Sequence, residues 1–509
     1  MIHLSKSRLL AHRQCPKRLW LQVNEPELLA DSSSTQASYA AGNRLGAIAQ
    51  QLFDPNEIGQ TFDVMTDGVQ AVMVQTQEAI ADTGNVLKHR PPLFEAGFEA
   101  AGARAFVDVL LPVKGPKNLP PRWAIVEVKS ATSLKDVYLE DAAIQYFAAT
   151  QAGLDLDSIA IAHVDNTWVY QGDDDYNGLL TTVDVTQKIQ ALVPCLPQWI
   201  EKAQAVLKRS KPPKVDTGAQ CSNPYPCGFL AHCQSTEPAV THPVQWLPRV
   251  QTKALREHLA RPEMKEMRDV PDALLNPQQL RVKKATLSGR TWTDTNGAAL
   301  ALAEHSASCY FLDFETIGDA VPRWAGTRAF EQIPFQFSVH FVGPRGGLKH
   351  EAFLDASGDD PRLALAKALV KACGTEGTVF AYNAGFEGRC ISALAEHVAS
   401  RRKLAKDLLA IKERLVDLEP IVRKHYYHPT QQGSWSLKAV LPALLPHLSY
   451  TALDGVQNGL DAQSAYMEAV NPTTPVARTK ALLQQMLDYC KLDTLALAEV
   501  WRKLSAPKN

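Results

Sequence analysis

The chain has 509 residues, 45% of them hydrophobic and 21% charged, and its formal net charge is −1. This length holds two or three domains with cores of their own, and the composition excludes a disordered or fibrous chain. Nine cysteines without a signal peptide favour a reducing cytoplasm over a disulfide framework, and no apolar run approaches the length of a membrane span.

The first half of the chain is expected to begin with helices and to continue with strands. The helices are predicted from the spacing of apolar residues, and the first of them is expected to break near Cys15-Pro16. The strands are predicted from the alternation of apolar and polar residues. These elements are helices over residues 5–20, 39–53 and 68–82, and strands over 93–99, 103–111 and 123–130.

Three ionisable residues on the last two of these strands form a candidate catalytic set. Asp108 stands in the middle of an apolar strand, where an unpaired carboxylate is costly to bury. Glu127 and Lys129 are two residues apart, so they project from one face of the next strand. We expect Asp108 and Glu127 to share Mg²⁺ or Mn²⁺, with Lys129 beside an attacking water and Glu95 as a further candidate ligand. The alternative is a surface Glu-x-Lys pair, which many strands carry.

Three equally spaced thiols follow in a loop rich in Pro and Gly, at Cys221, Cys227 and Cys233, and Cys15 is the best candidate for a fourth. Soft thiolates suit an iron–sulfur cluster or zinc, and such a centre would close a loop of about two hundred residues. The other cysteines are expected to fill cores, namely Cys195, Cys309, Cys373, Cys390 and Cys490.

These motifs resemble the iron–sulfur branch of the RecB-like PD-(D/E)XK nucleases, which includes the AddB nuclease domain and the CRISPR-associated RecB-like exonucleases. Asp108, Glu127 and Lys129 match that family's acidic and E-x-K motifs. One cysteine before the core and three after it match the family's cluster ligands. Over residues 1–240, the resemblance implies a restriction-endonuclease-like α/β domain with a [4Fe–4S] cluster.

Two glutamines also bear on this resemblance. Gln145 lies on the helix after the E-x-K strand, where the family usually has Q-x-x-x-Y. Gln50 stands where the family has a metal-binding His. Loss of that imidazole would either weaken metal binding or mark a domain that binds DNA without cutting it.

The second half is expected to alternate strands and helices. Residues 241–305 show no clear strand pattern and are interpreted as a partly helical connecting region. Buried and alternating patterns then predict strands, and helical spacing predicts the helices between them. These elements are strands over residues 308–316, 334–341, 350–355 and 378–383, and helices over 360–373 and 482–504.

Carboxylates in this half are also paired by spacing. Asp313 and Glu315 end a buried strand and lie on one face of it by the two-residue period. Tyr489 and Asp493 are four apart in a predicted helix, so they lie on one side of it. We expect these carboxylates to converge on a pair of divalent ions, the usual device for in-line phosphodiester displacement, with Tyr489 orienting the water.

Both pairs resemble motifs of the DnaQ-like, DEDD 3′–5′ exonucleases of the Y-x-x-x-D type. The second motif of that superfamily, N-x-x-F-D, falls on Asn383 to Glu387, so Glu stands where Asp is expected. Asp417 is the alternative carboxylate, and Lys438 opens a helix that is expected nearby. The resemblance implies a ribonuclease H-like α/β domain over residues 306–509.

The whole arrangement resembles bacterial proteins that join an iron–sulfur RecB-like nuclease to a DnaQ-like domain. It predicts a cytoplasmic, metal-dependent nuclease that acts on single-stranded DNA or DNA ends in repair, recombination or defence, with helicase or defence-system proteins as partners. The alternative is a nucleic-acid-binding protein with one or both sites degenerate, because of Gln50 and Glu387.

Overall fold

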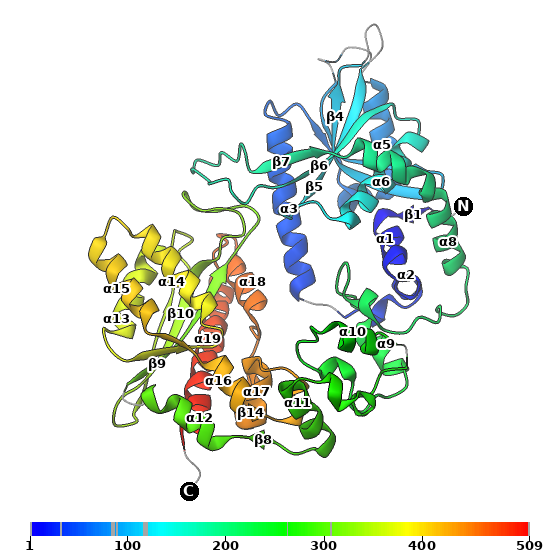
Figure 1. The fold of residues 1–509 in the computed structure, drawn as a ribbon. Coiled ribbons are helices and arrows are strands. Elements are labelled where there is room, and N and C mark those ends of the chain that lie inside the picture. Colours follow the sequence, from blue (N-terminus) through cyan, green and yellow to red (C-terminus); the bar gives the residue numbers. More distant parts are fainter. Residues whose placement is uncertain are drawn as a thin grey trace. The chain divides into compact units, whose positions relative to one another are not determined.

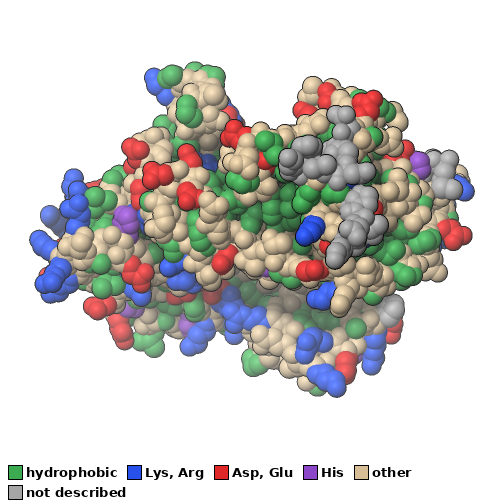
Figure 2. Space-filling view, turned by 90° about the horizontal axis from the view of Figure 1, so that it is seen from above, with side chains coloured by type: hydrophobic (Ala, Val, Ile, Leu, Met, Phe, Trp, Pro, Cys, Tyr) green, Lys and Arg blue, Asp and Glu red, His purple; other side chains and the backbone are tan. Residues whose placement is uncertain are grey.

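The computed structural model describes residues 3–30, 33–82, 87, 90–115, 121–261, 263–305 and 308–506 (Figure 1). The chain is a mixed α/β protein, which confirms the predicted class. It forms two compact units: Met1–Pro238 with Gly318–Glu331, and Ala239–Ile317 with Gln332–Asn509. No helix among the described residues is both long and apolar enough to cross a membrane. On the face shown in Figure 2, basic and acidic side chains are interspersed.

Unit 1 is built on a seven-stranded sheet of order β2-β3-β4-β5-β6-β7, with β1 pairing with β4 off this path. The pairs β1–β4, β2–β3 and β5–β6 are parallel, and the others are antiparallel. The strands are β1 (Leu4–Ser5), β2 (Gln60–Thr61), β3 (Leu93–Ala100), β4 (Ala103–Val113), β5 (Arg122–Lys129), β6 (Leu156–Val164) and β7 (Leu180–Asp184).

Two strands, β5 and β1, pair with different parts of the same edge of β4. Strand β5 pairs with β4 from Val113 back to Val109, and β1 pairs with its first two residues, Ala103 and Arg104. Among the described pairings, Asp108 therefore lies at the fork where β5 leaves β4. The predicted turn that joins these two strands lies partly outside the described residues.

Helices cover this sheet on both faces. The helix α6 (Asp136–Gln151) packs on it through Ala142, Ile144 and Phe147, in one core with Leu9 of α1 (Lys6–Gln14). The predicted break at Cys15-Pro16 is confirmed, because Cys15 is extended and Pro16 begins the next helix. The other helices of unit 1 are α2 (Pro16–Asn24), α3 (Ser33–Phe53), α4 (Val64–Asp67), α5 (Val69–Asp82), α7 (Thr186–Leu192), α8 (Leu196–Leu207) and α9 (Leu230–Thr236).

Unit 2 is built on a five-stranded sheet of order β11-β10-β9-β12-β13. The pairs β10–β11 and β9–β10 are antiparallel, whereas β9–β12 and β12–β13 are parallel. The strands are β9 (Cys309–Ile317), β10 (Ile333–Val342), β11 (Leu348–Leu354), β12 (Thr378–Ala381) and β13 (Leu415–Asp417), with a separate pair of β8 (Trp292–Thr293) and β14 (Tyr426–Tyr427).

Two helical layers enclose this sheet because its strands are apolar on both faces. Leu312 and Phe314 of β9 pack against α13 (Arg362–Cys373), α14 (Gly385–His397) and α15 (Arg402–Glu413). Phe311, on the opposite face, packs near Leu497 of α19 (Val476–Ser505), the long helix of Figure 1. Other helices of this unit are α12 (Thr295–Leu302), α16 (Leu418–His425), α17 (Leu437–Leu444) and α18 (Gly459–Ala469).

Residues 241–305, interpreted from the sequence as a connecting region, pack into the core of unit 2. Leu255 of α10 (Lys253–Leu259) and Val282 of α11 (Pro277–Ser288) are fully buried in one cluster with Phe311. Apolar side chains are sparse in residues 241–305, so the sequence showed no periodic pattern that would predict a buried face there.

The segment Gly318–Glu331 belongs to unit 1, although its neighbours in the sequence belong to unit 2. Val321 packs there with Leu45 and Tyr170, and Asp319 pairs with Arg44 at 2.8 Å. Of the cysteines expected in cores, four are buried, but Cys195 is exposed in the turn before α8, so that prediction is wrong.

Candidate metal centres

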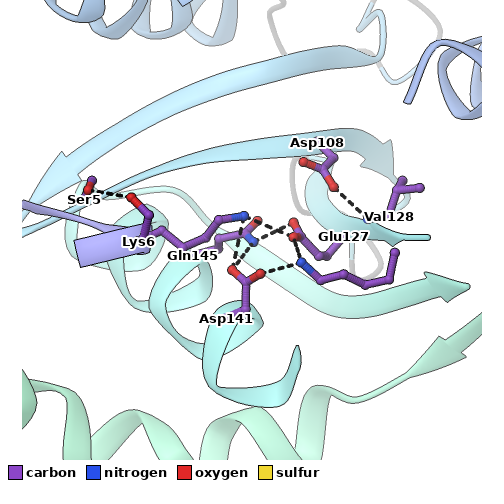
Figure 3. A network of polar contacts seen from close by, with 9 residues as sticks. Ser5, Lys6, Asp108, Glu127, Val128, Asp141 and Gln145 are labelled. Carbon is purple, nitrogen blue, oxygen red and sulfur yellow. Dashed lines mark hydrogen bonds and ion pairs between the residues drawn. The ribbon is translucent and has the colours of Figure 1, made fainter. Parts of the chain in front are cut away.

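Glu127 and Lys129 of β5 lie in a buried network of ion pairs and hydrogen bonds (Figure 3). Lys129 contacts Glu127 Oε1 and Asp141 Oδ2 of α6. Gln145, one helical turn beyond Asp141, donates to Glu127 Oε2 at 2.5 Å. The Glu127 side chain is 1% exposed, so these partners replace water around its charge.

Asp108 and Glu95 line the same cavity as Glu127 and Lys129, a cavity of about 470 Å³. Asp108 Oδ2 accepts from the backbone N–H of Val128 at 2.7 Å (Figure 3). Glu95 has a φ of 57°, in the left-handed region, and non-glycine residues persist there only when their surroundings hold them. The predicted set of Glu95, Asp108, Glu127 and Lys129 therefore meets at one cavity.

The charges of this cavity shift the pKa of each carboxyl. Burial raises the pKa of Asp108 well above its ordinary value, and Glu127 raises it further. Burial also raises the pKa of Glu95. Burial alone would raise the pKa of Glu127, but Lys129 and Lys6 together hold it below its usual range. Glu127 is thus ionised in the metal-free site.

Lys6 is a member of this network that the sequence reasoning missed. Its Nζ lies 3.0 Å from Glu127 Oε1 and 3.1 Å from Asp141 Oδ1 (Figure 3). Burial alone would lower the pKa of Lys6, yet Asp141 and Glu127 raise it above its ordinary value. A cation in the first turn of a helix opposes the helix dipole, so a Lys directly after the Ser5 cap was a signal of a tertiary role.

Replacing Lys6 by Ala should raise the affinity of unit 1 for Mn²⁺ by ~10-fold, because it removes a cation that competes for Glu127 and Asp141. Any cleavage by this site should fall, because Glu127 loses a partner that holds it. Calorimetric titration with Mn²⁺, in a background with Asp313→Asn to disable unit 2, checks this. Lys135→Ala is the matched control, because Lys135 is exposed and lies over the Tyr138 ring as Lys129 does. Unchanged or weaker Mn²⁺ binding by Lys6→Ala would contradict it.

The two glutamines also lie at this site. Gln145 is fully buried and holds Glu127 through a hydrogen bond. Gln50 of α3 lines the same cavity, and its Oε1 accepts from Thr61 Oγ1 at 3.4 Å. The Gln50 side chain offers a neutral amide oxygen at this cavity.

The four predicted thiols line one cavity beside α2 and α9. Gln14, at the end of α1, donates through Nε2 to the carbonyls of Gln220 and Tyr225, each at 2.7 Å, and so ties the three-cysteine loop to Cys15. Burial raises the pKa of Cys227 and Cys233, and the neighbouring thiols raise it further. These thiols would carry their protons in the absence of a metal, whereas coordination would remove them.

In unit 2, Asp313 and Glu315 of β9 face α19, where Cys490 joins them. One ligand atom from each of these three residues lies within 4.8 Å of the other two. The Cys490 thiol lies 3.6 Å from Asp313 Oδ2. Cys490 is buried as expected, but it contacts the carboxylates and does not pack among apolar side chains alone.

Asp493 and Tyr489 lie on the side of α19 that faces this cluster. Asp493 is 8% exposed and accepts from the Tyr450 hydroxyl at 2.5 Å, a partner that the sequence did not reveal. The Lys438 Nζ lies 5.2 Å from the centre of the Tyr489 ring and 5.4 Å from that of Tyr450. The positive charge of Lys438 lowers the pKa values of Glu315 and Asp493, and so opposes the effect of burial.

Glu387, at the start of α14, is 2% exposed, and its Oε2 is a buried oxygen with no hydrogen-bond partner among the described residues. Asn383, just before it, has a φ of 66° in the left-handed region. Asp417 Oδ1 accepts from the backbone N–H groups of Asn383 and Glu419, at 3.0 Å each, and so caps α16. The capping explains a carboxylate at 417 without a metal, whereas the unpartnered oxygen of Glu387 favours Glu387 as the ligand.

Burial raises the pKa values of these carboxyls. Burial is the largest cause in each, and it raises the pKa of Glu315 to about 8, of Glu387 to about 8 and of Asp493 to about 6. Burial raises the pKa of Asp313 well above its ordinary value, and the charges of Asp493 and Glu315 raise it further. A metal-free centre therefore holds protons that a divalent ion would displace.

The metal-free protein should lose stability as the pH rises toward 8. Glu315 binds a proton in the folded state up to a pH of about 8 and in the unfolded state only up to about 4.5, so the folded state binds more protons between these values. The free energy of unfolding then falls with pH in this window, and the affinity for Mn²⁺ rises. Calorimetric melting temperatures at pH 5.5 and 8, with and without Mn²⁺, check this. Equal stabilisation by Mn²⁺ at both pH values would contradict it.

Comparison with known proteins gives one family. A family described as "Domain of unknown function (DUF2779)" matches residues 310–436. The matched region contains Asp313, Glu315 and Glu387, and it ends before Tyr489 and Asp493. No curated protein matches the chain.

Proposed function

We propose that the chain is a divalent-cation-dependent nuclease with one phosphodiesterase centre in each unit, acting on single-stranded DNA or DNA ends. The observation that carries this proposal is the carboxylate cluster of unit 2. Side chains from β9 and α19, with Glu387 of α14 beside them, are gathered in a buried space. Buried carboxylates repel one another, so such a cluster is stable at neutral pH chiefly with protons or cations bound.

Counter-charge supports a different number of ions in the two centres. In unit 1, Lys6 and Lys129 balance two of the four carboxylates Glu95, Asp108, Glu127 and Asp141, so one divalent ion completes neutrality. In unit 2, Asp313, Glu315, Glu387 and Asp493 have only Lys438 as a nearby cation among the residues named in their shifts, apart from Arg389 beside Glu387. Lys438 leaves three of these four negative charges unbalanced, which is more than one divalent ion carries, and two ions would be balanced only together with the negative charge of a bound phosphate.

The chemistry of unit 1 follows from its side chains. A divalent ion held by Asp108 and Glu127 would supply positive charge to an oxygen of the scissile phosphate. Lys129, which pairs with Glu127 and Asp141, would donate a hydrogen bond to the attacking water, and Asp141 would keep its ammonium group in place. Gln145 fixes the orientation of Glu127 throughout.

The chemistry of unit 2 differs. Ions held by its four carboxylates would activate a water and stabilise the leaving 3′ oxygen. Tyr489 orients the water, and burial, followed by the charge of Asp493, raises the pKa of Tyr489, so it donates as a neutral hydroxyl. Tyr450 holds Asp493 in one orientation.

The strand arrangements support the finer fold assignments that this proposal includes. In unit 1, acidic and E-x-K strands that diverge at Asp108 are typical of a PD-(D/E)XK restriction-endonuclease-like domain. In unit 2, antiparallel strands followed by parallel ones, with carboxylates on β9, are typical of a ribonuclease H-like, DnaQ-like domain.

The thiol centre is proposed to hold a [4Fe–4S] cluster, with zinc as the alternative. A tetrahedral zinc site would hold its sulfurs ~3.8 Å apart, from a Zn–S bond of about 2.3 Å. A [4Fe–4S] cluster also takes four thiolates, and the four thiols of this chain line one cavity. Iron and sulfide analysis of protein purified without oxygen should find four irons per chain, and zinc without sulfide would support the alternative.

Hydrolysis of end-labelled single-stranded and duplex DNA, with Mg²⁺, Mn²⁺ or EDTA, tests the proposed activity. The wild type should shorten the single strand when a divalent ion is present, and a chain carrying both Lys129→Ala and Asp313→Asn should not. Cleavage in EDTA, or by that double variant, would refute the two centres. Assignment to repair, recombination or defence, in the cytoplasm and with helicase or defence-system partners, remains part of the same proposal.

A second candidate function is a nucleic-acid-binding module without catalysis. Gln50 in the unit 1 cavity and Glu387 in unit 2 favour it, because Gln50 stands where the resembled nucleases have a metal-binding His, and Glu387 stands where the resembled exonucleases have Asp. Binding of labelled DNA without metal-stimulated cleavage by the wild type would support the module.

A further inference from the structure

A basic pocket of unit 2 lies outside both centres. It is a cavity of about 580 Å³ between the chain near residue 249, the first turn of α11 and the length of α16. Four cationic side chains and one carboxylate line it. These are Arg249, Arg281, Arg423 and Lys424, with Glu419.

The charge of this pocket is largely uncompensated. Glu419 accepts from Arg423 Nε at 2.7 Å, so the single carboxylate is already paired. The side chains of Arg249 and Lys424 are exposed, and neither forms an ion pair among the described residues. The pocket therefore presents positive charge to solvent, in a chain whose net charge is close to zero.

The walls are held rigidly. The Arg281 guanidinium stacks on Trp292 at 3.7 Å and donates through Nη1 to the Lys424 carbonyl at 2.9 Å. Gln279 is 3% exposed and donates to the Pro248 carbonyl at 2.9 Å, which ties the chain before Arg249 to α11. A guanidinium group has five N–H donors, so Arg281 keeps donors for a ligand.

A further donor in this pocket has no acceptor. The side-chain Nε2 of Gln278 is a buried nitrogen without a hydrogen-bond partner among the described residues. It belongs to the first turn of α11, whose N-terminal dipole also favours an anion. An unpaired buried donor beside several cations is satisfied by a group rich in acceptor oxygens.

We propose that this pocket binds a backbone phosphate of the single strand that unit 2 cleaves, an inference that rests on the proposed nuclease function. The helix α16 joins the two places: Asp417, which caps it, holds the N–H of Asn383 next to Glu387, and its last turn carries Arg423 and Lys424. Eight residues of helix span ~12 Å, so the bound phosphate belongs to a nucleotide near the scissile bond.

Fluorescence anisotropy with a labelled single-stranded oligonucleotide tests the pocket, in EDTA so that no cleavage occurs. The double variant Arg249→Glu, Lys424→Glu should bind at least 10-fold more weakly than the wild type. Its salt dependence should fall by ~0.7 in the slope of log K against log salt, because the variant no longer neutralises the one phosphate that the pocket holds. The control variant Arg401→Glu, Arg402→Glu changes exposed cations that do not line the pocket, and should bind as the wild type does.

The alternative source of the same chemistry is a free phosphate compound, probed with inorganic pyrophosphate. If the pocket variant loses the binding of pyrophosphate that the wild type shows, but binds the oligonucleotide as tightly as the wild type does, the pocket does not hold the strand. Oligonucleotide binding lowered equally by the control variant would also overturn it. Both variants replace exposed side chains, so we expect both to fold normally. Melting temperatures equal to that of the wild type would confirm this.

The proposed function can fail separately. A wild type that binds the oligonucleotide in EDTA through Arg249 and Lys424, but does not cleave it with Mn²⁺, supports the pocket and refutes the nuclease. A wild type that cleaves, with a pocket variant that binds normally, refutes the pocket alone.

Discussion

Replacing Asp313 by Asn is expected to abolish cleavage by unit 2 and, at the same time, to raise the melting temperature of the metal-free protein. Asp313 lies beside Glu315 and Cys490, and burial, followed by the charges of Asp493 and Glu315, raises its pKa. An amide of the same shape removes that repulsion, which stabilises the metal-free fold. It also removes an anionic ligand from the ion that activates the water, so the cleavage rate should fall by ~10³-fold or more.

The cleavage rate should fall while the melting temperature rises, so a loss of activity in this variant cannot come from unfolding. Cleavage is best measured in a chain that also carries Lys129→Ala, so that unit 1 does not contribute. Asp488→Asn is the control, since Asp488 is an exposed carboxylate on α19 directly before Tyr489. A variant that cleaves normally, or that melts at a lower temperature than the wild type, would contradict the assignment.

Replacing Lys129 by Ala is expected to lower cleavage by unit 1 by ~10³-fold, the usual effect of losing a group that stabilises charge in the transition state. It should also lower the melting temperature, because Lys129 pairs with both Glu127 and Asp141, and Lys6 alone remains to balance them. The same substitution should leave cleavage by unit 2 unchanged, since each centre has its own ligands.

Assay of Lys129→Ala with Asp313→Asn in the background measures unit 1 alone. Lys135→Ala serves as the control, because it removes an exposed ammonium group over the same Tyr138 ring. Equal loss in the control would indicate a general effect of charge near α6, and no loss in Lys129→Ala would remove Lys129 from the chemistry.

Strong local patterns allowed much of the fold to be predicted. The strands β3, β4, β5, β9 and β10 carry clear alternation or apolar runs, and the structure places them within a few residues of the predicted bounds. The two-residue strands β1 and β2 were not predicted, because a pattern needs more residues to be recognised. The strand β6 was not predicted either, and its pairing with β5 along its length depends on tertiary contacts.

The position of the segment Gly318–Glu331 could not be predicted either. Its apolar residues, such as Val321 and Ala320, are few and follow no period, and their partners Leu45 and Tyr170 lie more than a hundred residues away in the sequence. When a residue packs against partners so far away in the sequence, the residues next to it carry no pattern that predicts the contact.

The candidate centres were predictable where spacing determines geometry. A two-residue period places Asp313 with Glu315, and four residues place Tyr489 with Asp493, whatever the rest of the chain does. Lys6 and Tyr450 were missed because their partners, Glu127 and Asp493, lie on distant elements. No period connects such residues.

Anomalous scattering from Mn²⁺ in crystals of the wild type tests the two centres most directly. We expect one manganese site held by Asp108 and Glu127, and two sites among Asp313, Glu315, Glu387 and Asp493. Absence of manganese at either carboxylate set, at a pH of about 8 where Glu315 and Glu387 can give up their protons, would contradict the hydrolytic assignment of that unit.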